Sequence, residues 1–467
     1  MSVRVGGAST GESIGNAVNE TSLLELSRKL IAIDSTTTHG TEDIARVLAE
    51  LARSWGLHVE VIEETWNGIA NANILITPKS NDAANSELIL SSALDTAEPG
   101  EYGLWNKTGA NPFKASLDGG SLYGLGAVDA KGDILAKMMA LKIAGSSASS
   151  AHAAVVGTFG RESGNGMIRL IRRKKIKPRF ALVGSPTKLS VANRAPGFAK
   201  VEIALPLTAN ERRHIERQNM SEGSYSQSKI FSGSPSGKVV SLGLLDNPII
   251  KMIDYLKNLP AGIAILSVDG GTSAESSPDF VELEVQIVDA LTDGVIGKLL
   301  KVGELIKRFS AELKAVEEKS FTPAHSTVNV GQIRMLPEEV KITGICRLVP
   351  AADREIYEKW LERLRQDCAA AGAQFQILDY KPPFSADASS AFFGRLKGVS
   401  SSLGLNQEIV AAHQATSANV FHRLGIETAA FGAGSWAGAE QAPQEHVDIR
   451  DLIKATEFYR SVIEKGI

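Results

Sequence analysis

Two acidic residues follow apolar segments, at positions where catalytic carboxylates are common. Asp95 lies near the end of the run LILSSALDT (residues 88–96), and Asp129 lies in the glycine-rich segment YGLGAVDAKGD (residues 123–133), which leads into an apolar helix. Carboxylates at the C-terminal ends of buried strands are a frequent starting point for a site that holds divalent metal ions and activates water. The two segments therefore indicate a hydrolase-type site, to which further ligands must contribute.

The segments around these acids alternate between strands and helices. Apolar runs predict buried strands at residues 88–94, 151–159 and 179–184, and helical spacing predicts a helix at 130–143. This alternation is typical of a parallel or mixed sheet that is covered on both faces. Functional groups gather beyond the carboxyl ends of such strands, and Asp95, Glu162 and Ser185 all stand there.

The order of elements changes after residue 196. Strands and helices alternate in the order β-α-β-β-α-β-β-α-β, which indicates a separate α+β domain. A polar, serine-rich stretch inside it, residues 208–238, predicts a long loop or lid segment. The fold expected is two-domain α/β, with residues 1–196 and 381–467 forming a mixed-sheet catalytic-type domain. Residues 197–380 form the inserted α+β lid or dimerisation domain.

Composition limits the function and the location. Of the 467 residues, 43% are hydrophobic and 22% are charged, as in ordinary globular proteins. The net charge of -3 argues against a nucleic-acid or anionic-membrane partner. The two cysteines, Cys346 and Cys368, have no metal-type spacing and indicate a reducing compartment. With neither a targeting segment nor a membrane-spanning run, the expected location is the cytoplasm.

Five short motifs follow one another along the chain. They are ALDTAEP (93–99), GLGAVDAKG (124–132), GRESG (160–164), GSPT (184–187) and FGAG (431–434) followed by QAPQE (441–445). In this order they resemble the M20 family of metallopeptidases and amidohydrolases, which includes acetylornithine deacetylases, succinyl-diaminopimelate desuccinylases and carboxypeptidases. The resemblance spans nearly the whole chain. It implies a catalytic domain with two zinc ions, a lid domain that often mediates homodimerisation, and hydrolysis of amide bonds in N-acyl amino acids or short peptides.

The resemblance also implies roles for single residues. Asp95 corresponds to the acid that orients a metal-binding histidine, but Ala93 stands where that histidine belongs. Asp129 corresponds to the acid that bridges both metals, and Glu162 to another ligand. The position of the general base holds Arg161.

The two remaining ligand positions hold Ser185 and Gln441, which are weak neutral ligands. A pair of zinc-like ions needs about three protein ligands per ion, so no tightly bound metal is expected at this site. Asp129 and Glu162 could still hold a hydrated Mg²⁺ or Ca²⁺ loosely. A guanidinium is always cationic and cannot take a proton from water. We therefore expect Arg161 to replace the metal charge and to pair with Asp129 or Glu162.

Further candidates follow from the same resemblance. His446 stands beside Glu445 in place of a common tyrosine and is a candidate acid or base. Glu275 replaces an asparagine that contacts substrate in the lid turn, and Arg347 matches the arginine that binds the substrate carboxylate. The proposed ligand-binding residues are Arg347, Glu275, Lys131, Asp129, Gln441 and Ser185, and the proposed catalytic residues are Arg161, Glu162, Asp95 and His446.

Simpler interpretations of these residues stay open. A lone histidine is more often a hydrogen-bonded polar residue than a ligand, and an arginine in a strand is often ion-paired. Asp129 and Glu162 can also be structural remnants, one capping a loop and the other in a buried salt bridge.

The sequence is compatible with three functions. The first is a metal-free pseudo-hydrolase that binds an amino-acid, N-acyl-amino-acid or peptide-like ligand between the domains, or serves a protein partner. The second is an enzyme with repurposed amide chemistry. The third is an active M20-type deacylase or peptidase with a non-standard metal site. The sequence alone does not decide whether the chain is an enzyme.

Overall fold

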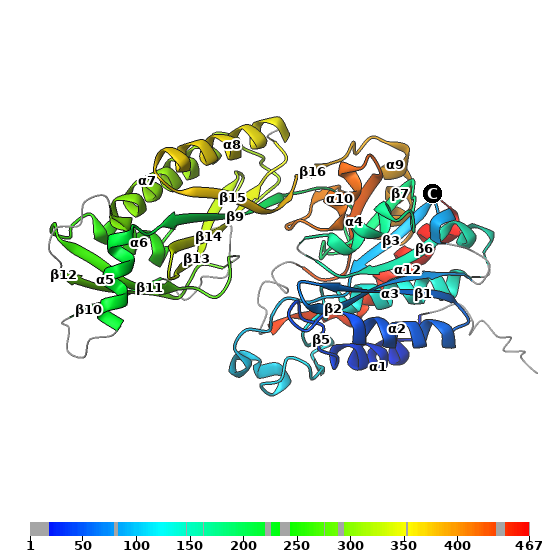
Figure 1. Ribbon diagram of the computed structural model, residues 1–467. Coiled ribbons are helices and arrows are strands. Elements are labelled where there is room, and N and C mark those ends of the chain that lie inside the picture. The colour runs from blue at the N-terminus through cyan, green and yellow to red at the C-terminus, as the bar shows by residue number, and fades with distance from the viewer. Residues whose placement is uncertain are drawn as a thin grey trace, which may run out of the picture. The chain divides into compact units, whose positions relative to one another are not determined.

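The computed structural model describes residues 18–78, 83–145, 147–161, 163–219, 226–233, 243–274, 276–287, 294–351, 354–435 and 444–466. The chain divides into two compact units, each of which combines helices with sheet (Figure 1). Unit 1 comprises Met1–Val191, Ser389–Glu408 and Phe431–Ile467, and unit 2 comprises Ala192–Ala388 and Ile409–Ala430. The domain boundaries at 196/197 and 380/381 stay predictions.

Unit 1 is built on a mixed sheet. Its strands lie in the order β1 (His58–Trp66), β2 (Ile69–Thr77), β6 (Ala153–Thr158), β3 (Leu88–Ala93), β7 (Phe180–Gly184). β1, β2 and β6 pair antiparallel, whereas β3 runs parallel to both β6 and β7. Because the strands β6, β3 and β7 are parallel, the loops that follow all three leave the same edge of the sheet. A smaller sheet orders β19 (His446–Asp448), β5 (Ser121–Tyr123) and β4 (Ser116–Asp118).

The helices of unit 1 bury apolar faces against this sheet and against one another. They are α1 (Glu20–Ile31), α2 (Glu42–Ser54), α3 (Lys131–Ala144), α4 (Asn165–Arg172), α9 (Ala391–Ser402) and α12 (Ile449–Lys465). α3 packs on β3, β6, α1 and α12, which leaves nearly all of its residues buried. On α2 the buried face includes Ile44, Leu48 and Ala52, at the spacing of an amphipathic helix. Each buried leucine or isoleucine contributes about 1.5–3 kcal/mol.

Unit 2 contains a seven-stranded antiparallel sheet. Its order is β10 (Gln227–Ser232), β12 (Phe280–Ile287), β11 (Ile263–Gly270), β13 (Thr327–Met335), β14 (Glu339–Leu348), β9 (Gly197–Pro206), β15 (Gln374–Lys381). The helices are α5 (Ala209–Asn219), α6 (Pro248–Leu256), α7 (Val295–Leu313), α8 (Arg354–Ala370) and α10 (Ser417–Arg423). Residues of α6, α7, α8 and the sheet share one apolar core, exemplified by Ile253, Leu299 and Ile342. The remaining strands are β8 (Ala192–Ala195), β16 (Phe384–Ser385), β17 (Val410–Ala411) and β18 (Glu427–Phe431).

The structure differs from the local sequence patterns in three places. The stretch 208–238 is not wholly a loop, because it contains α5 and β10. The strand β2 was not predicted, since Asn71 and Asn73 interrupt its apolar pattern, yet both are buried. Thr41 precedes α2 but does not cap it with its side chain. Its hydroxyl instead donates to the Ala72 carbonyl O (2.9 Å) and ties the helix start to β2.

Within the residues described, no helix is both long and apolar enough to cross a bilayer.

Candidate active site

Asp95 fixes the loop that carries Arg161. It follows β3, is 3% exposed, and its two carboxylate oxygens accept the backbone N–H of Arg161 at 3.1 and 2.9 Å. Ala93 of β3 lies opposite Thr158 of β6 in the parallel register, so the two following loops start side by side. The acid expected to orient a histidine ligand therefore holds the backbone of the neighbouring loop.

The Arg161 side chain forms an ion pair with Asp129. Its Nη2 lies 2.8 Å from Asp129 Oδ2, and the two side chains are only 13% and 16% exposed. A charge-assisted hydrogen bond of this length, largely removed from water, is among the stronger polar contacts in proteins. Of the two acids named as partners of Arg161, the structure places Asp129 against it. Glu162 lies outside the described residues.

A further acid, Glu445, holds the backbone of the Asp129 loop. One carboxylate oxygen accepts the N–H of Gly126 (2.9 Å), and the other accepts those of Val128 (2.9 Å) and Asp129 (3.1 Å). Burial raises the pKa of Glu445 to about 7, against the lowering effect of these hydrogen bonds. The sequence did not reveal this role, although Glu445 closes the QAPQE motif. It therefore fixes the loop from a distant part of the sequence, near the C-terminal end of the chain.

Lys131 lies behind the same loop. Its ammonium donates to the carbonyl oxygens of Ile33 (2.7 Å) and Ile31 (3.3 Å), and only 1% of the residue is exposed. Burial lowers the pKa of Lys131 to about 8, while Glu445 and Asp34 oppose the shift. These contacts join the loop to the end of α1. The Lys131 amine, which was proposed to bind ligand, therefore donates to two backbone carbonyls instead.

Ser185 follows β7 and is 5% exposed. Its N–H donates to the Phe431 carbonyl O (3.2 Å). Gly432 lies so close that a Cβ built there would stand 2.5 Å from the Ser185 carbonyl O, so glycine is required at this contact. The glycine-rich motif 431–434 thus acts here by close backbone approach.

His446 belongs to β19 and stacks on Tyr123 of β5, with ring centroids 4.9 Å apart. Its Nδ1 lies 2.8 Å from the Gln444 carbonyl O. A carbonyl can only accept, so Nδ1 carries a hydrogen and Nε2 is the nitrogen left to accept a proton. No contact described for His446 joins it to Arg161 or Asp129.

Arg347 lies in unit 2, on β14 opposite Thr327 of β13. It is 9% exposed, donates to the Pro323 carbonyl O (3.3 Å) and lies over the Phe321 ring (5.3 Å to the centroid). Among the described residues it has no carboxylate partner, and burial lowers its pKa to about 10. The simpler interpretation, that Arg347 is ion-paired, is therefore not supported within the described residues.

The described residues do not make up a donor set for two metal ions. The methyl group of Ala93 cannot coordinate, Ser185 is neutral, and Asp129 already binds a guanidinium. No group of three or more His, Cys, Asp or Glu side chains suited to a metal occurs in the described ranges. Two of the proposed positions, Glu275 and Gln441, lie outside those ranges, as Glu162 does.

Comparison with known proteins agrees with the motif order. The sequence profile of peptidase family M20/M25/M40 matches residues 89–465. A succinyl-diaminopimelate desuccinylase from Novosphingobium aromaticivorans is 32% identical over 197 residues (41% of this chain, 44% of the relative). A second desuccinylase, from Wolbachia pipientis subsp. Culex pipiens, is 28% identical over 243 residues (50% of this chain, 53% of the relative). The alignments thus span about half the length of these curated relatives.

The fold has counterparts among solved structures. An M20 family metallo-carboxypeptidase from Sulfolobus solfataricus superposes with a TM-score of 0.56 at 15% identity, covering 95% of this chain and 98% of that one. At this identity the likeness shows the fold alone, a mixed α/β architecture. Together with the profile match over most of the sequence, it confirms the family expected from the motifs: the chain belongs to peptidase family M20/M25/M40.

Proposed function

We propose that this chain is a metal-independent member of its family, a pseudo-hydrolase that binds an amino-acid, N-acyl-amino-acid or peptide-like ligand. The observation that carries the proposal is the ion pair between Arg161 and Asp129. Arg161 stands where the family's general base would stand, and Asp129 where its bridging carboxylate would stand. A guanidinium can neither activate water as a base nor bind a metal ion.

The ion pair also competes with any cation for Asp129. A divalent ion that entered here would have to displace the guanidinium from the carboxylate. Removing one partner of a fully buried ion pair costs about 3–5 kcal/mol. The cost is somewhat smaller for this pair, whose side chains are 13% and 16% exposed. Ala93 and Ser185 offer such an ion no charged ligand in return.

Arg347 is the residue that we assign to the ligand's carboxylate. Within the described ranges, this guanidinium, which is 9% exposed, donates to one carbonyl and lies over one aromatic ring, so several of its donors are unused in a desolvated setting. Five N–H donors in a planar fork match a carboxylate bidentately. An anionic ligand would therefore supply the partner that the described residues do not.

Ligand-induced stabilisation tests this function. Thermal unfolding of the full chain is measured with a panel of N-acyl and free amino acids, once with EDTA and once with Zn²⁺ or Mn²⁺. A ligand at 100 times its Kd stabilises the folded state by about 2.7 kcal/mol. We expect the same rise in Tm under both conditions. A rise that occurs only with added metal would contradict the proposal.

A pair of variants tests the assignment of Arg347. Arg347→Met removes the charge and keeps an apolar stem in the same space, so it should fold and lose the ligand-induced rise in Tm. Arg334→Met is the matched control, because Arg334 lies in the same sheet and already pairs with Asp269. A ligand response that survives Arg347→Met would remove Arg347 from the site without removing the binding function.

Two broader properties belong to the same proposal. We propose a cytoplasmic location, which is supported by the two buried free thiols of Cys346 and Cys368. We also propose a homodimer, by analogy with the family's lid domain. Light scattering coupled to size-exclusion chromatography measures the mass, and a monomer at micromolar concentration would contradict the dimer.

A further inference from the structure

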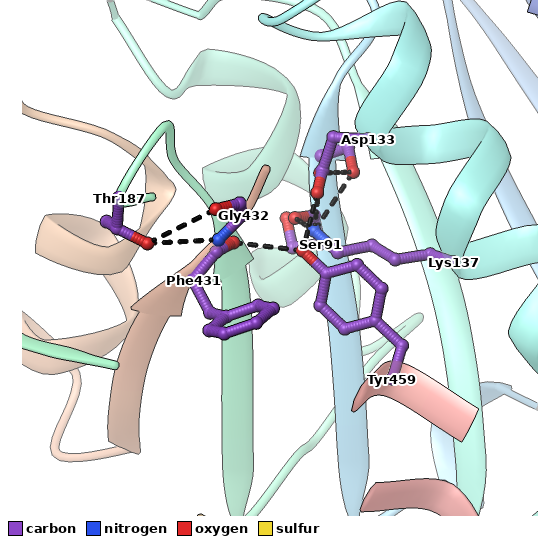
Figure 2. Close-up of polar contacts among 8 residues, drawn as sticks. Ser91, Asp133, Lys137, Thr187, Phe431, Gly432 and Tyr459 are labelled. Atoms are coloured by element: carbon purple, nitrogen blue, oxygen red, sulfur yellow. Dashed lines mark hydrogen bonds and ion pairs between the residues drawn. The ribbon is translucent and has the colours of Figure 1, made fainter. Parts of the chain in front are cut away.

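A network of buried polar side chains lies next to the candidate site, and none of its four side chains, Ser92, Asp133, Lys137 and Tyr459, belongs to the five family motifs. Asp133 and Lys137 stand one turn apart on α3, and the Lys137 side chain is completely buried. Figure 2 shows Asp133, Lys137 and Tyr459 converging on the backbone at Ser91 and Phe431. Buried charges are costly unless they are paired and fully hydrogen-bonded.

The network satisfies each of its charged groups. The Lys137 ammonium has three donors and three acceptors: Ser91 carbonyl O (2.6 Å), Asp133 Oδ2 (2.6 Å) and Ser92 Oγ (3.1 Å). Ser92 Oγ in turn donates to Asp133 Oδ2 (2.5 Å). Such fully satisfied networks hold their members in one arrangement.

Tyr459 of α12 extends the network to a third part of unit 1. Its Oη lies 2.6 Å from Asp133 Oδ1 and 2.9 Å from the Phe431 carbonyl O, so one hydrogen is shared between two acceptors (Figure 2). Burial beside Asp133 raises the pKa of Tyr459, which keeps the phenol protonated and able to donate. The Phe431 carbonyl also accepts the N–H of Ser185.

The network therefore touches the backbone on which several family ligand positions stand. Ser92 directly precedes Ala93, and α3 begins just after Asp129. Gly184 directly precedes Ser185, and a Cβ built there would clash with the Asp133 carboxylate. In a two-metal relative, ions bound to these positions would cross-link the strand ends. Here Lys137 of α3 binds Ser91 and Ser92 of β3, and Tyr459 of α12 binds the Phe431 carbonyl O that also accepts the Ser185 N–H.

We propose that the Lys137–Asp133–Ser92–Tyr459 network is an internal cross-link that takes over the organising role of metal coordination. Lys137, Asp133 and Tyr459 are then positioning residues, which keep the ends of β3 and β7 and the Phe431 carbonyl in place for a ligand. This inference rests on the proposed metal-independent function, because a bound metal pair would make the cross-link redundant.

Local hydrogen exchange at matched global stability tests the proposal. The double variant Lys137→Met/Asp133→Leu replaces the buried ion pair with apolar side chains, a change that other proteins tolerate with little loss of stability. We expect exchange about tenfold faster in the peptides covering residues 91–95 and 183–187 while the unfolding midpoint stays near that of wild type. Tyr459→Phe is the milder variant and should accelerate exchange only around residues 431–432 and 183–187.

Arg169→Met is the matched control. Arg169 forms an ion pair with Glu64, whose side chain is only 4% exposed, and this pair joins α4 to β1 rather than to the ends of β3 and β7. Its loss should leave exchange at 91–95 and 183–187 unchanged. Unchanged protection at these segments in both the double variant and Tyr459→Phe would overturn the cross-link.

The same measurement separates this inference from the proposed function. If the variants exchange faster and added Zn²⁺ returns their protection to the wild-type level, the cross-link is present and the proposed metal independence is wrong. If ligand binding is metal-independent but no variant changes local exchange, the function stands and the cross-link is wrong.

Discussion

The ion pair between Arg161 and Asp129 should contribute a measurable coupling energy to folding. The two variants are Arg161→Met and Asp129→Asn, measured singly and together in a double-mutant cycle. Arg161→Met removes the guanidinium from this pair, and Asp129→Asn removes the carboxylate charge from it. The cycle removes the effects that each substitution has on other neighbours.

The expected magnitude follows from distance and burial. Two unit charges about 4 Å apart attract by about 4 kcal/mol at the effective dielectric of a protein surface and by about 1 kcal/mol in water. With Nη2 and Oδ2 at 2.8 Å and exposures of 13% and 16%, the pair lies toward the first value. The desolvation of both charges offsets part of it. We expect a coupling of about 2–3 kcal/mol, against about 0.2–1 kcal/mol for an exposed pair.

Urea unfolding of the four proteins, followed by tryptophan fluorescence, supplies the energies. The control cycle uses Lys107 and Asp118, a pair of similar length (2.6 Å) whose side chains are 50% and 56% exposed. Added salt should weaken the control more than the Arg161 pair. A coupling for Arg161 and Asp129 that equals the control value would show that the guanidinium does not hold this carboxylate, and the reasoning about metal replacement would fail.

Two further predictions concern the loops around the site. Folding raises the pKa of Glu445 from 4.5 to about 7, so between these pH values the unfolded chain releases a proton that the folded chain keeps, and stability should fall by about 3 kcal/mol as pH rises through this window. Glu445→Gln should flatten the Tm–pH curve between pH 4.5 and about 7. An unchanged slope in this variant would contradict the role of Glu445. Gly432→Ala should destabilise the chain by about 1–3 kcal/mol, because its Cβ would stand 2.5 Å from the Ser185 carbonyl O. Gly394→Ala, where a Cβ meets nothing within 4 Å, is the control and should be neutral or stabilising in the same urea titration.

Much of the architecture could be predicted from local patterns. The parallel strands β3, β6 and β7 follow from apolar runs, and the motif order correctly predicted the family. The contact between Arg161 and Asp129 was also foreseeable. Both positions belong to motifs whose backbones meet at one site in the family, and opposite charges that meet in a poorly solvated place pair.

The rest depended on contacts that no local pattern reveals. In the sequence, no local pattern links Glu445 to the glycine-rich segment, and only the folded chain brings it to the N–H groups of Gly126, Val128 and Asp129. Asp133 and Lys137 at i,i+4 are typical of an exposed helical ion pair, yet α3 is buried and Tyr459 closes the network from the last helix. For Arg347 the sequence left two interpretations open, a carboxylate-binding arginine and an ion-paired strand residue, and its burial and its contact with the Pro323 carbonyl O came only from the structure.

Metal content tests the central claim most directly. The full chain is purified from cells supplied with zinc, manganese and cobalt, dialysed without chelator, and measured by inductively coupled plasma mass spectrometry. A variant that restores family ligands serves as the positive control: Ala93→His, Arg161→Glu, Ser185→Asp and Gln441→His combined. We predict that the wild-type chain retains well below one equivalent of any of these metals, while the variant retains more. A tightly held pair of ions in the wild-type chain would contradict the replacement of metal by Arg161.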